Sequence, residues 1–202
     1  ATLWVRPGEQ LLVQACRLIP KKGLATSLRA FAKFAERHEH ASFTIAGEGP
    51  QLENLRSLAN NLGIGERVFF TGFLDQEKLR GLFSESHLFL HPSEMGPDGD
   101  QEGIPNSMLE AMASGLPVLA TTHGGIPEAV EDGTSGVLVA EQDSAALAAE
   151  MLTIADDRTR YERFSQAAAE RVRANFDLKT QARVLEQIYD EAAKLQISRV
   201  PA

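Results

Sequence analysis

Six short apolar runs recur along the chain, and stretches with helical periodicity separate almost every run from the next. The runs cover residues 11–15, 43–46, 67–71, 87–91, 116–120 and 136–140. They are apolar at successive positions, not at every second one, which indicates strands buried on both faces. Strands that alternate with helices typically form a parallel sheet. The sequence therefore predicts a doubly wound (Rossmann-like) α/β fold with a six-stranded parallel sheet and flanking helices.

The connecting stretches carry recognisable helix signals. Leu24 and Phe31 are two turns apart on one apolar helix face. Gly63 suits the end of a second helix, and Asp75 and Asp143 suit the N-caps of two more. After residue 140 the chain is helical to its end, and the last apolar stripe needs a partner surface outside this chain. No repeat or linker is evident, so residues 1–202 are predicted to form one domain.

Charge and composition narrow the choice of ligand. The formal charge is −8, so nucleic acid and anionic membrane are poor partners for the chain as a whole. Cys16 is the only cysteine, which rules out an internal disulfide and favours a reducing compartment. No apolar run approaches the ~20 residues of a membrane span, and no signal segment opens the chain. Because the chain starts at Ala1 and not at Met, we expect that an upstream segment was removed.

The segment after the fourth run contains the densest set of candidate functional residues. Ligands of open α/β sheets bind beyond the carboxyl ends of the strands, near the point where strand order reverses. Pro105 suits the first turn of a helix and Gly115 its end, so Glu102 precedes that helix and Glu110 lies about two turns along it. Helical rise would separate the two carboxylates by roughly 12 Å. Free backbone amides between the two carboxylates would attract phosphate. Hydroxyl contacts at either end with phosphate contacts in the middle are what a nucleotide sugar needs.

The same segment carries a family resemblance. The stretch EGIPNSMLEAMASGLPVLATTHGGIPE, which starts at Glu102, resembles the signature of glycosyltransferase family 4 and its GT-B relatives. Residues 15–23, 46–50 and 70–73 resemble three further family segments, in the expected order. The family builds its enzymes from two α/β domains, and this chain resembles the C-terminal, donor-binding one. The resemblance implies that helices in 158–195 pack partly towards an N-terminal, acceptor-binding domain of the same enzyme.

The resemblance implies a retaining transfer of sugar from a nucleoside diphosphate sugar to an acceptor hydroxyl, without a metal or other cofactor. Cleavage leaves negative charge on the diphosphate, and Arg17 and Lys22 occupy the positions of the family's stabilising arginine and lysine. Glu102 would hold a hydroxyl of the donor sugar, and these three residues are the expected catalytic set. Glu110 would accept hydrogen bonds from the ribose hydroxyls.

The remaining expected substrate contacts involve backbone amides and one apolar side chain. The amides of Gly103, Ile104 and Asn106 would bind the diphosphate at a helix N-terminus. Leu74, just after the third run, would pack near the base. Ile104 replaces a phenylalanine that is common in the family, which leaves the sugar preference open.

Several residues have a second interpretation. Gly124 and Gly125 lie near the phosphates in the family, but the pair also suits a plain strand-to-helix turn. Asp98 and Asp100 superficially match the metal-binding Asp-x-Asp motif of another glycosyltransferase fold, and two carboxylates could hold a divalent cation. These residues belong to an acidic loop, Glu94–Gln101, and a turn or an acceptor-contacting loop is its favoured interpretation. His123, like His91, could contact the donor, although a structural histidine is the favoured interpretation of each.

Two rival functions fit a doubly wound sheet. A non-catalytic nucleotide-sugar-binding module would use the same residues. An oxidoreductase is disfavoured, because Gly47 and Gly49 follow the second run and lack the third glycine of a nicotinamide fingerprint. The expected enzyme is cytoplasmic, with peripheral contact at the inner membrane face as an option, and serves polysaccharide or glycoconjugate synthesis. Its nucleotide (UDP, GDP or ADP), its sugar and its acceptor stay open.

Overall fold

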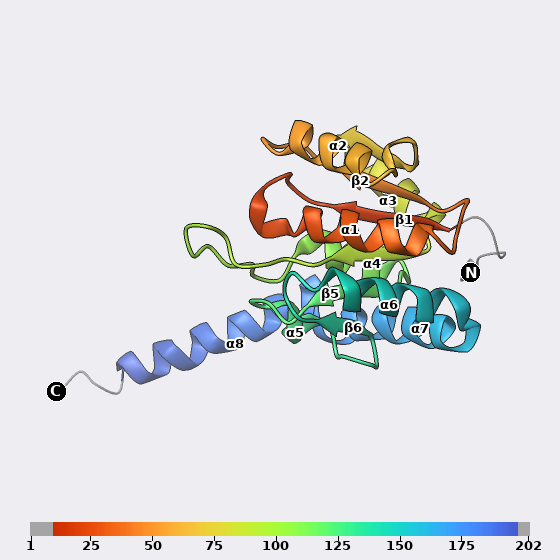
Figure 1. Ribbon diagram of the computed structural model, residues 1–202. Helices are drawn as coiled ribbons and strands as arrows, with labels where there is room; N and C mark the ends of the chain where they lie inside the picture. Colours follow the sequence, from red (N-terminus) through yellow and green to blue (C-terminus); the bar gives the residue numbers. More distant parts are fainter. Residues whose placement is uncertain (1–9, 198–202) are drawn as a thin grey trace.

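The computed structural model describes the backbone of residues 10–197, and side chains up to residue 194 (Figure 1). The described residues form one six-stranded, all-parallel sheet in the order β3-β2-β1-β4-β5-β6. The strands are β1 (Leu11–Ala15), β2 (Ser42–Ala46), β3 (Val68–Gly72), β4 (Leu88–His91), β5 (Val118–Thr121) and β6 (Gly136–Val139). This arrangement confirms the predicted doubly wound fold, and the strand order reverses between β1 and β4.

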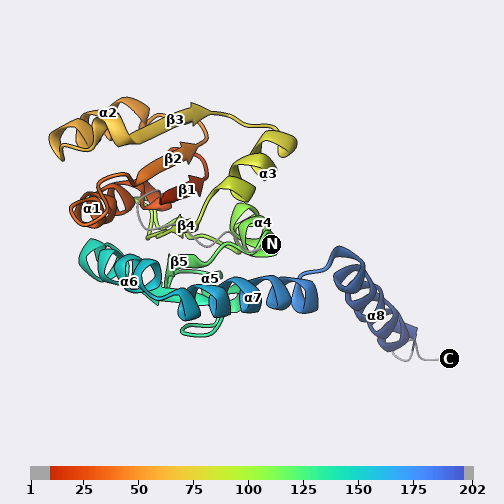
Figure 2. The ribbon, with the colours of Figure 1, turned by 90° about the vertical axis from the view of Figure 1, so that its right-hand side faces the viewer.

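Helices cover both faces of the sheet, as Figure 2 shows. The α-helices are α1 (Leu24–Ala35), α2 (Leu52–Asn61), α3 (Gln76–Glu85), α4 (Asn106–Ala113), α5 (Ile126–Ala129), α6 (Ser144–Asp156), α7 (Arg158–Asn175) and α8 (Leu178–Ile197). Two short 3₁₀ turns, η1 (Pro20–Lys22) and η2 (Gly65–Arg67), complete the described elements. Helices α1, α2 and α6 lie on one side of the sheet, and α3 and α4 on the other.

Two clusters of buried apolar side chains fill the space between the sheet and these helix layers. Phe31 and Phe43 belong to the cluster under α1, α2 and α6, whereas Phe83 and Met108 belong to the cluster under α3, α4 and α5. Burying a side chain of this size contributes about 1.5–3 kcal/mol. Helix α7 contributes to both clusters and contacts α6 on one side and α4 on the other, so it joins the two helix layers.

The predicted helix signals agree with the structure. Asp75 Oδ1 accepts the backbone N–H of Lys78 at 2.9 Å, and Asp143 Oδ1 accepts two backbone N–H groups of α6. Gly63 follows the end of α2 with a φ of +72°. These local signals depend on neighbours within four residues, which is why the sequence alone predicts them.

One strand departs from the prediction. All six runs were predicted to be buried on both faces, and this is wrong for β3, where Phe69 is 51% exposed and burial alternates along the strand. The reason is coverage, because Val68 and Phe70 pack against the core on one face while the Phe69 face is left uncovered; β6, the other edge strand, is mostly buried. The strand boundaries themselves lie within two residues of those predicted.

Helix α8 extends away from the sheet and its covering helices (Figures 1 and 2). Its Leu185, Ile188 and Tyr189 side chains are 53%, 56% and 68% exposed. This agrees with a C-terminal apolar stripe that finds no partner among the described residues. No helix in residues 10–197 has the length and apolar character needed to cross a membrane.

The connections that follow β1 and β4 touch each other at the point of strand reversal. Gly23 has a φ of +62°, and a Cβ atom at this position would lie 1.7 Å from the carbonyl oxygen of Pro92. Glycine is therefore required here both by its backbone conformation and by the close approach of two chain segments.

We predict that Gly23→Ala destabilises the chain more than Gly63→Ala does. Both glycines adopt positive φ, which costs alanine about 1–2 kcal/mol, but a Cβ at Gly63 meets no atom within 4 Å. The clash at Gly23 should add at least about 2 kcal/mol. Urea unfolding of both variants measures the difference, and equal losses of unfolding free energy would contradict this account of the contact.

Candidate functional site

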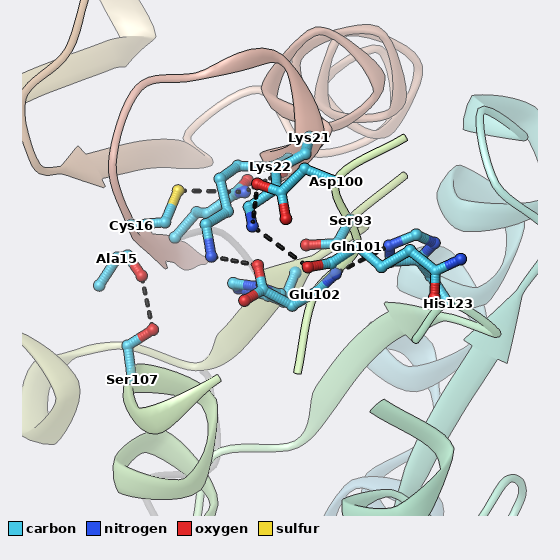
Figure 3. Close-up of polar contacts among 12 residues, drawn as sticks. Ala15, Cys16, Lys21, Lys22, Ser93, Asp100, Gln101, Glu102, Ser107 and His123 are labelled. Carbon is cyan, nitrogen blue, oxygen red and sulfur yellow. Dashed lines mark hydrogen bonds and ion pairs between the residues drawn. The ribbon is translucent and has the colours of Figure 1, made fainter. Parts of the chain in front are cut away.

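An ion pair joins two connections at the strand reversal. Lys22, the last residue of η1, contacts the carboxylate of Glu102 in the β4–α4 connection through its Nζ atom (Figure 3). The lysine is 8% exposed and the glutamate side chain 12% exposed. Two of the three predicted catalytic residues, 80 positions apart in sequence, therefore lie in direct contact.

The environment of Glu102 keeps its carboxylate ionised. Burial by itself raises the pKa of this carboxyl. The neighbouring His91 ring and the Lys22 ammonium lower the pKa by more, so that its net value is about 2. His91 Nε2 lies 3.8 Å from Glu102 Oε2, beyond normal hydrogen-bond length, and burial lowers the pKa of His91 so that its ring is neutral at pH 7. Lys22 is therefore the positively charged partner of Glu102.

Gln14 holds the Lys22 turn from within the core. This fully buried side chain donates from Nε2 to the backbone oxygen of Lys22 at 2.8 Å, and its Oε1 accepts a hydrogen bond from Ser27 at 2.6 Å. Both ends of the amide are thereby satisfied, as a buried polar group requires. The sequence analysis did not identify Gln14, although a glutamine within an otherwise apolar strand is a usable signal.

The helix that follows Glu102 begins later than predicted. Pro105 is the N-cap residue of α4 and not part of its first turn, so the first helical residue is Asn106. The estimate of roughly 12 Å between Glu102 and Glu110 assumed helical rise along the whole interval, and that assumption is wrong because residues 102–105 are not helical. Boundaries of this kind are the least certain part of a sequence-based assignment.

The N-terminus of α4 presents unused donors beside the ion pair. Within residues 10–197, the backbone N–H groups of Gly103, Ile104 and Asn106 donate no hydrogen bond. Ser107 fixes this helix end to the sheet, because its Oγ donates to the backbone oxygen of Ala15 at 2.6 Å (Figure 3). Free amides at a helix N-terminus favour an anion, as the sequence analysis expected.

A pocket of about 490 Å³ opens on the β1 side of this helix end. Its lining includes the predicted residues Arg17 and Leu74, together with Ser107. Glu110 lies three residues after Ser107 and thus on the same face of α4, where it accepts a hydrogen bond from Gln76 Nε2 at 3.3 Å. The predicted phosphate, base and ribose residues Arg17, Leu74 and Glu110 are consequently neighbours on one surface.

Gly124 and Gly125 support the Glu102 segment through their backbones. A Cβ atom on Gly124 would lie 2.0 Å from the carbonyl oxygen of Glu102, and Gly125 N donates to that oxygen at 3.1 Å. This packing gives the glycine pair a structural role in the β5–α5 turn. The predicted contact between this pair and phosphate stays a prediction.

Lys21 closes the acidic loop between β4 and Glu102. Its Nζ lies 2.7 Å from Asp100 Oδ2 and donates to the backbone oxygen of Gln101 at 3.2 Å (Figure 3). The backbone oxygen of Lys21 accepts Glu94 N–H at 2.9 Å. Asp98 Oδ1 accepts the backbone N–H of Asp100 at 3.2 Å, as in a turn. No group of three or more His, Cys, Asp or Glu residues among those described is arranged to hold a metal ion. The sequence analysis missed Lys21.

Taken together, the geometry suits an elongated anionic ligand. A lysine, an arginine and free amides gather at one helix end, and carboxylates lie on either side of them. Cations and amides bind phosphate oxygens, whereas carboxylates accept hydrogen bonds from hydroxyl groups.

Comparison with known proteins identifies the family. Residues 5–171 match the family model described as glycosyl transferases group 1. The amylovoran biosynthesis glycosyltransferase of Erwinia amylovora is 34% identical over 182 residues, which cover 90% of this chain and 45% of that protein. A GDP-mannose-dependent alpha-(1-6)-phosphatidylinositol monomannoside mannosyltransferase of Mycobacterium tuberculosis is 33% identical over 193 residues, covering 94% and 50%. The chain spans about a third to a half of the length of the curated relatives it matches.

Solved structures agree with this assignment. Anabaena HepE in complex with UDP and glucose superposes with a TM-score of 0.79 at 25% identity, covering 92% of this chain and 48% of that one. The C-terminal domain of a glycosyl transferase group 1 family protein from Francisella tularensis gives a TM-score of 0.75 at 22% identity, covering 85% and 88%. The chain belongs to the group 1 glycosyl transferases and has the fold of the C-terminal half of their GT-B enzymes.

Proposed function

We propose that this chain is the donor-binding domain of a retaining glycosyltransferase. It would bind a nucleoside diphosphate sugar and present the hexosyl group to an acceptor hydroxyl, in polysaccharide or glycoconjugate synthesis in the cytoplasm. The observation that carries the proposal is the meeting of Lys22, Glu102 and the N-terminus of α4 at the strand reversal. Relatives named for polysaccharide synthesis and for GDP-mannose-dependent transfer support it.

The diphosphate would bind between Arg17 and the N-terminus of α4. The charge of Lys22 is already balanced by Glu102, whereas Arg17 is exposed and forms no ion pair with a described residue. An incoming diphosphate would therefore meet Arg17 and the free amides first, and would then share Lys22 with Glu102. As the bond to the sugar breaks, the same groups would stabilise the charge that develops on the leaving phosphate.

The nucleoside and the sugar would extend to opposite sides of the phosphates. The pocket that Leu74 and Phe73 line suits the base, and Glu110 on the adjacent helix face suits the ribose hydroxyls. Glu102 would accept a hydrogen bond from a hydroxyl of the sugar. Its low pKa supports this role, because an ionised carboxylate offers only acceptors at neutral pH.

The site supports sugar transfer better than the oxidoreductase alternative. Cβ atoms on Gly47 and Gly49 would lie 1.9 Å and 2.4 Å from the backbone oxygens of Cys16 and Leu18. These two glycines therefore allow the β2 connection to pack on the β1 connection, which explains them without a dinucleotide.

A second domain would complete the enzyme. The chain spans half or less of the relatives it matches, and the exposed apolar stripe of α8 is available for packing against further protein. We propose that an N-terminal domain supplies the acceptor site and that the helices in 158–195 contact it.

We predict that Arg17→Ala weakens binding of a nucleoside diphosphate far more than binding of the uncharged nucleoside. A charge-assisted hydrogen bond contributes about 1.5–3 kcal/mol, which corresponds to roughly 10- to 150-fold in affinity. Calorimetry with UDP, GDP, uridine and guanosine measures the four affinities. Lys33→Ala, an exposed lysine of α1, is the matched control and should change none of them. Equal losses for nucleoside and diphosphate with Arg17→Ala would place the phosphates elsewhere.

We predict that the two glutamates differ in which ligand they affect. Glu110→Ala should weaken nucleoside diphosphate and nucleotide sugar alike, by about 10-fold or more, because both ligands contain the ribose. Glu102→Gln should weaken the nucleotide sugar relative to the nucleoside diphosphate, and binding of the bare diphosphate should not weaken, because Lys22 is then released from its ion pair. Glu186→Ala on the exposed face of α8 is the control.

Calorimetry with UDP and UDP-glucose, and with GDP and GDP-mannose, distinguishes the two patterns. If Glu102→Gln weakens the bare diphosphate as much as Glu110→Ala does, the proposed orientation of the donor is wrong.

A further inference from the structure

The backbone of Glu102 is held by a histidine from a third connection. The N–H of Glu102 donates to Nε2 of His123 at 3.1 Å, as Figure 3 shows. His123 follows β5 and is 2% exposed. A backbone amide can only donate, so Nε2 must be unprotonated to accept this hydrogen bond.

A carboxylate fixes the other side of the same ring. Nδ1 of His123 lies 2.7 Å from Glu141 Oε1. Since Nε2 has no proton, Nδ1 carries it and donates to Glu141, and the ring is neutral in this single tautomer. The hydrogen bonds from Met95 N–H and from His123 lower the pKa of the Glu141 carboxyl, so it is ionised and accepts both.

Glu141 also holds the far end of the acidic loop. Its second oxygen, Oε2, accepts the backbone N–H of Met95 at 2.8 Å. Through His123, the same carboxylate thus constrains the backbone at residue 95 and at residue 102. Glu141, which follows β6, and His123 together hold the base of the loop between these residues, in addition to the contacts of Lys21.

We propose that His123 is a positioning residue for Glu102 and that Glu141 sets its tautomer; this inference rests on the proposed function. The hydrogen bond fixes the orientation of the Glu102 backbone N–H and with it the direction in which the carboxylate leaves the backbone. Lys22 holds that carboxylate from the opposite side. The Glu102 side chain is thereby held in its binding orientation before the donor binds, which reduces the conformational entropy lost on contact with the sugar.

Another histidine provides a matched control within the same chain. Leu11 N–H donates to Nδ1 of His87 at 2.9 Å, which is the same kind of bond from a backbone amide to a histidine ring. His87 precedes β4 and Leu11 begins β1, so this bond lies at the amino end of the sheet, opposite the site. Its loss should affect stability without affecting the sugar.

Nitrogen NMR of the histidine-labelled chain tests the tautomer directly. At pH 7.5 we expect His123 to show a protonated Nδ1 and an unprotonated Nε2. The glutamine side chain of the Glu141→Gln variant has only one acceptor oxygen. It cannot accept hydrogen bonds from both the Met95 N–H and the His123 Nδ1–H, so the preference for this tautomer should weaken. An Nε2–H or doubly protonated ring in the unsubstituted chain would overturn the inference.

Ligand binding then distinguishes positioning from plain stability. The readout is the ratio of the dissociation constant of UDP to that of UDP-glucose, or of GDP to that of GDP-mannose, whichever pair binds the unsubstituted chain. His123→Phe removes the acceptor and should lower this ratio about 5- to 10-fold, with little change for the bare diphosphate. His123→Gln retains an acceptor oxygen near the position of Nε2 and should restore most of the ratio. His87→Phe should leave the ratio unchanged.

The outcomes separate this inference from the proposed function. If none of UDP, GDP and ADP binds the unsubstituted chain, the proposed function fails and the positioning role fails with it. If the pair binds but His123→Phe changes the ratio no more than His87→Phe does, the positioning role is wrong and the donor site stands. Failure of His123→Gln to restore the ratio would also contradict the proposed acceptor role.

Discussion

The ion pair between Lys22 and Glu102 is the interaction on which the rest of the site depends. It joins the connections that follow β1 and β4, the two strands between which the sheet order reverses. Both groups are nearly buried, and removing one partner of a buried pair leaves an uncompensated charge that costs about 3–5 kcal/mol. The pair therefore keeps the two connections together while leaving the amides of α4 open.

Supports from three further elements surround this pair. Gln14 holds the Lys22 turn from β1, Ser107 fixes the start of α4 to the end of β1, and His123 holds the backbone of Glu102. Each makes a hydrogen bond to a backbone group, so each fixes the course of a connection and not only one side chain. A site held in this way loses little conformational entropy when a ligand binds. In the proposed donor complex, the exchange of Lys22 from Glu102 to an incoming phosphate would then need only a local change.

Sequence patterns within a few residues predicted the fold. Contacts between residues far apart in sequence determine the exposure of β3 and the supports of the candidate site. The caps at Asp75 and Asp143 and the alternation of strands and helices are local features, which is why the sequence analysis identified them. The exposed face of β3 was missed because the local sequence does not say which strand faces the rest of the chain covers. The family resemblance identified Lys22 and Glu102 but not their supports. The bonds that hold them join residues far apart in sequence, as the 21 positions between Glu102 and His123 illustrate.

Backbone amide NMR during a titration with UDP or GDP tests the central claim most directly. The measurement should be made in buffer with EDTA, because the proposed anion site consists of cations and amides and needs no metal. The account predicts that the largest shifts occur at Arg17, Gly103, Ile104 and Asn106. A second pocket of about 690 Å³, lined in part by Tyr161 and Ser165, lies between α4 and α7 and provides the contrast. Shifts centred on that pocket, with none at the start of α4, would contradict the account.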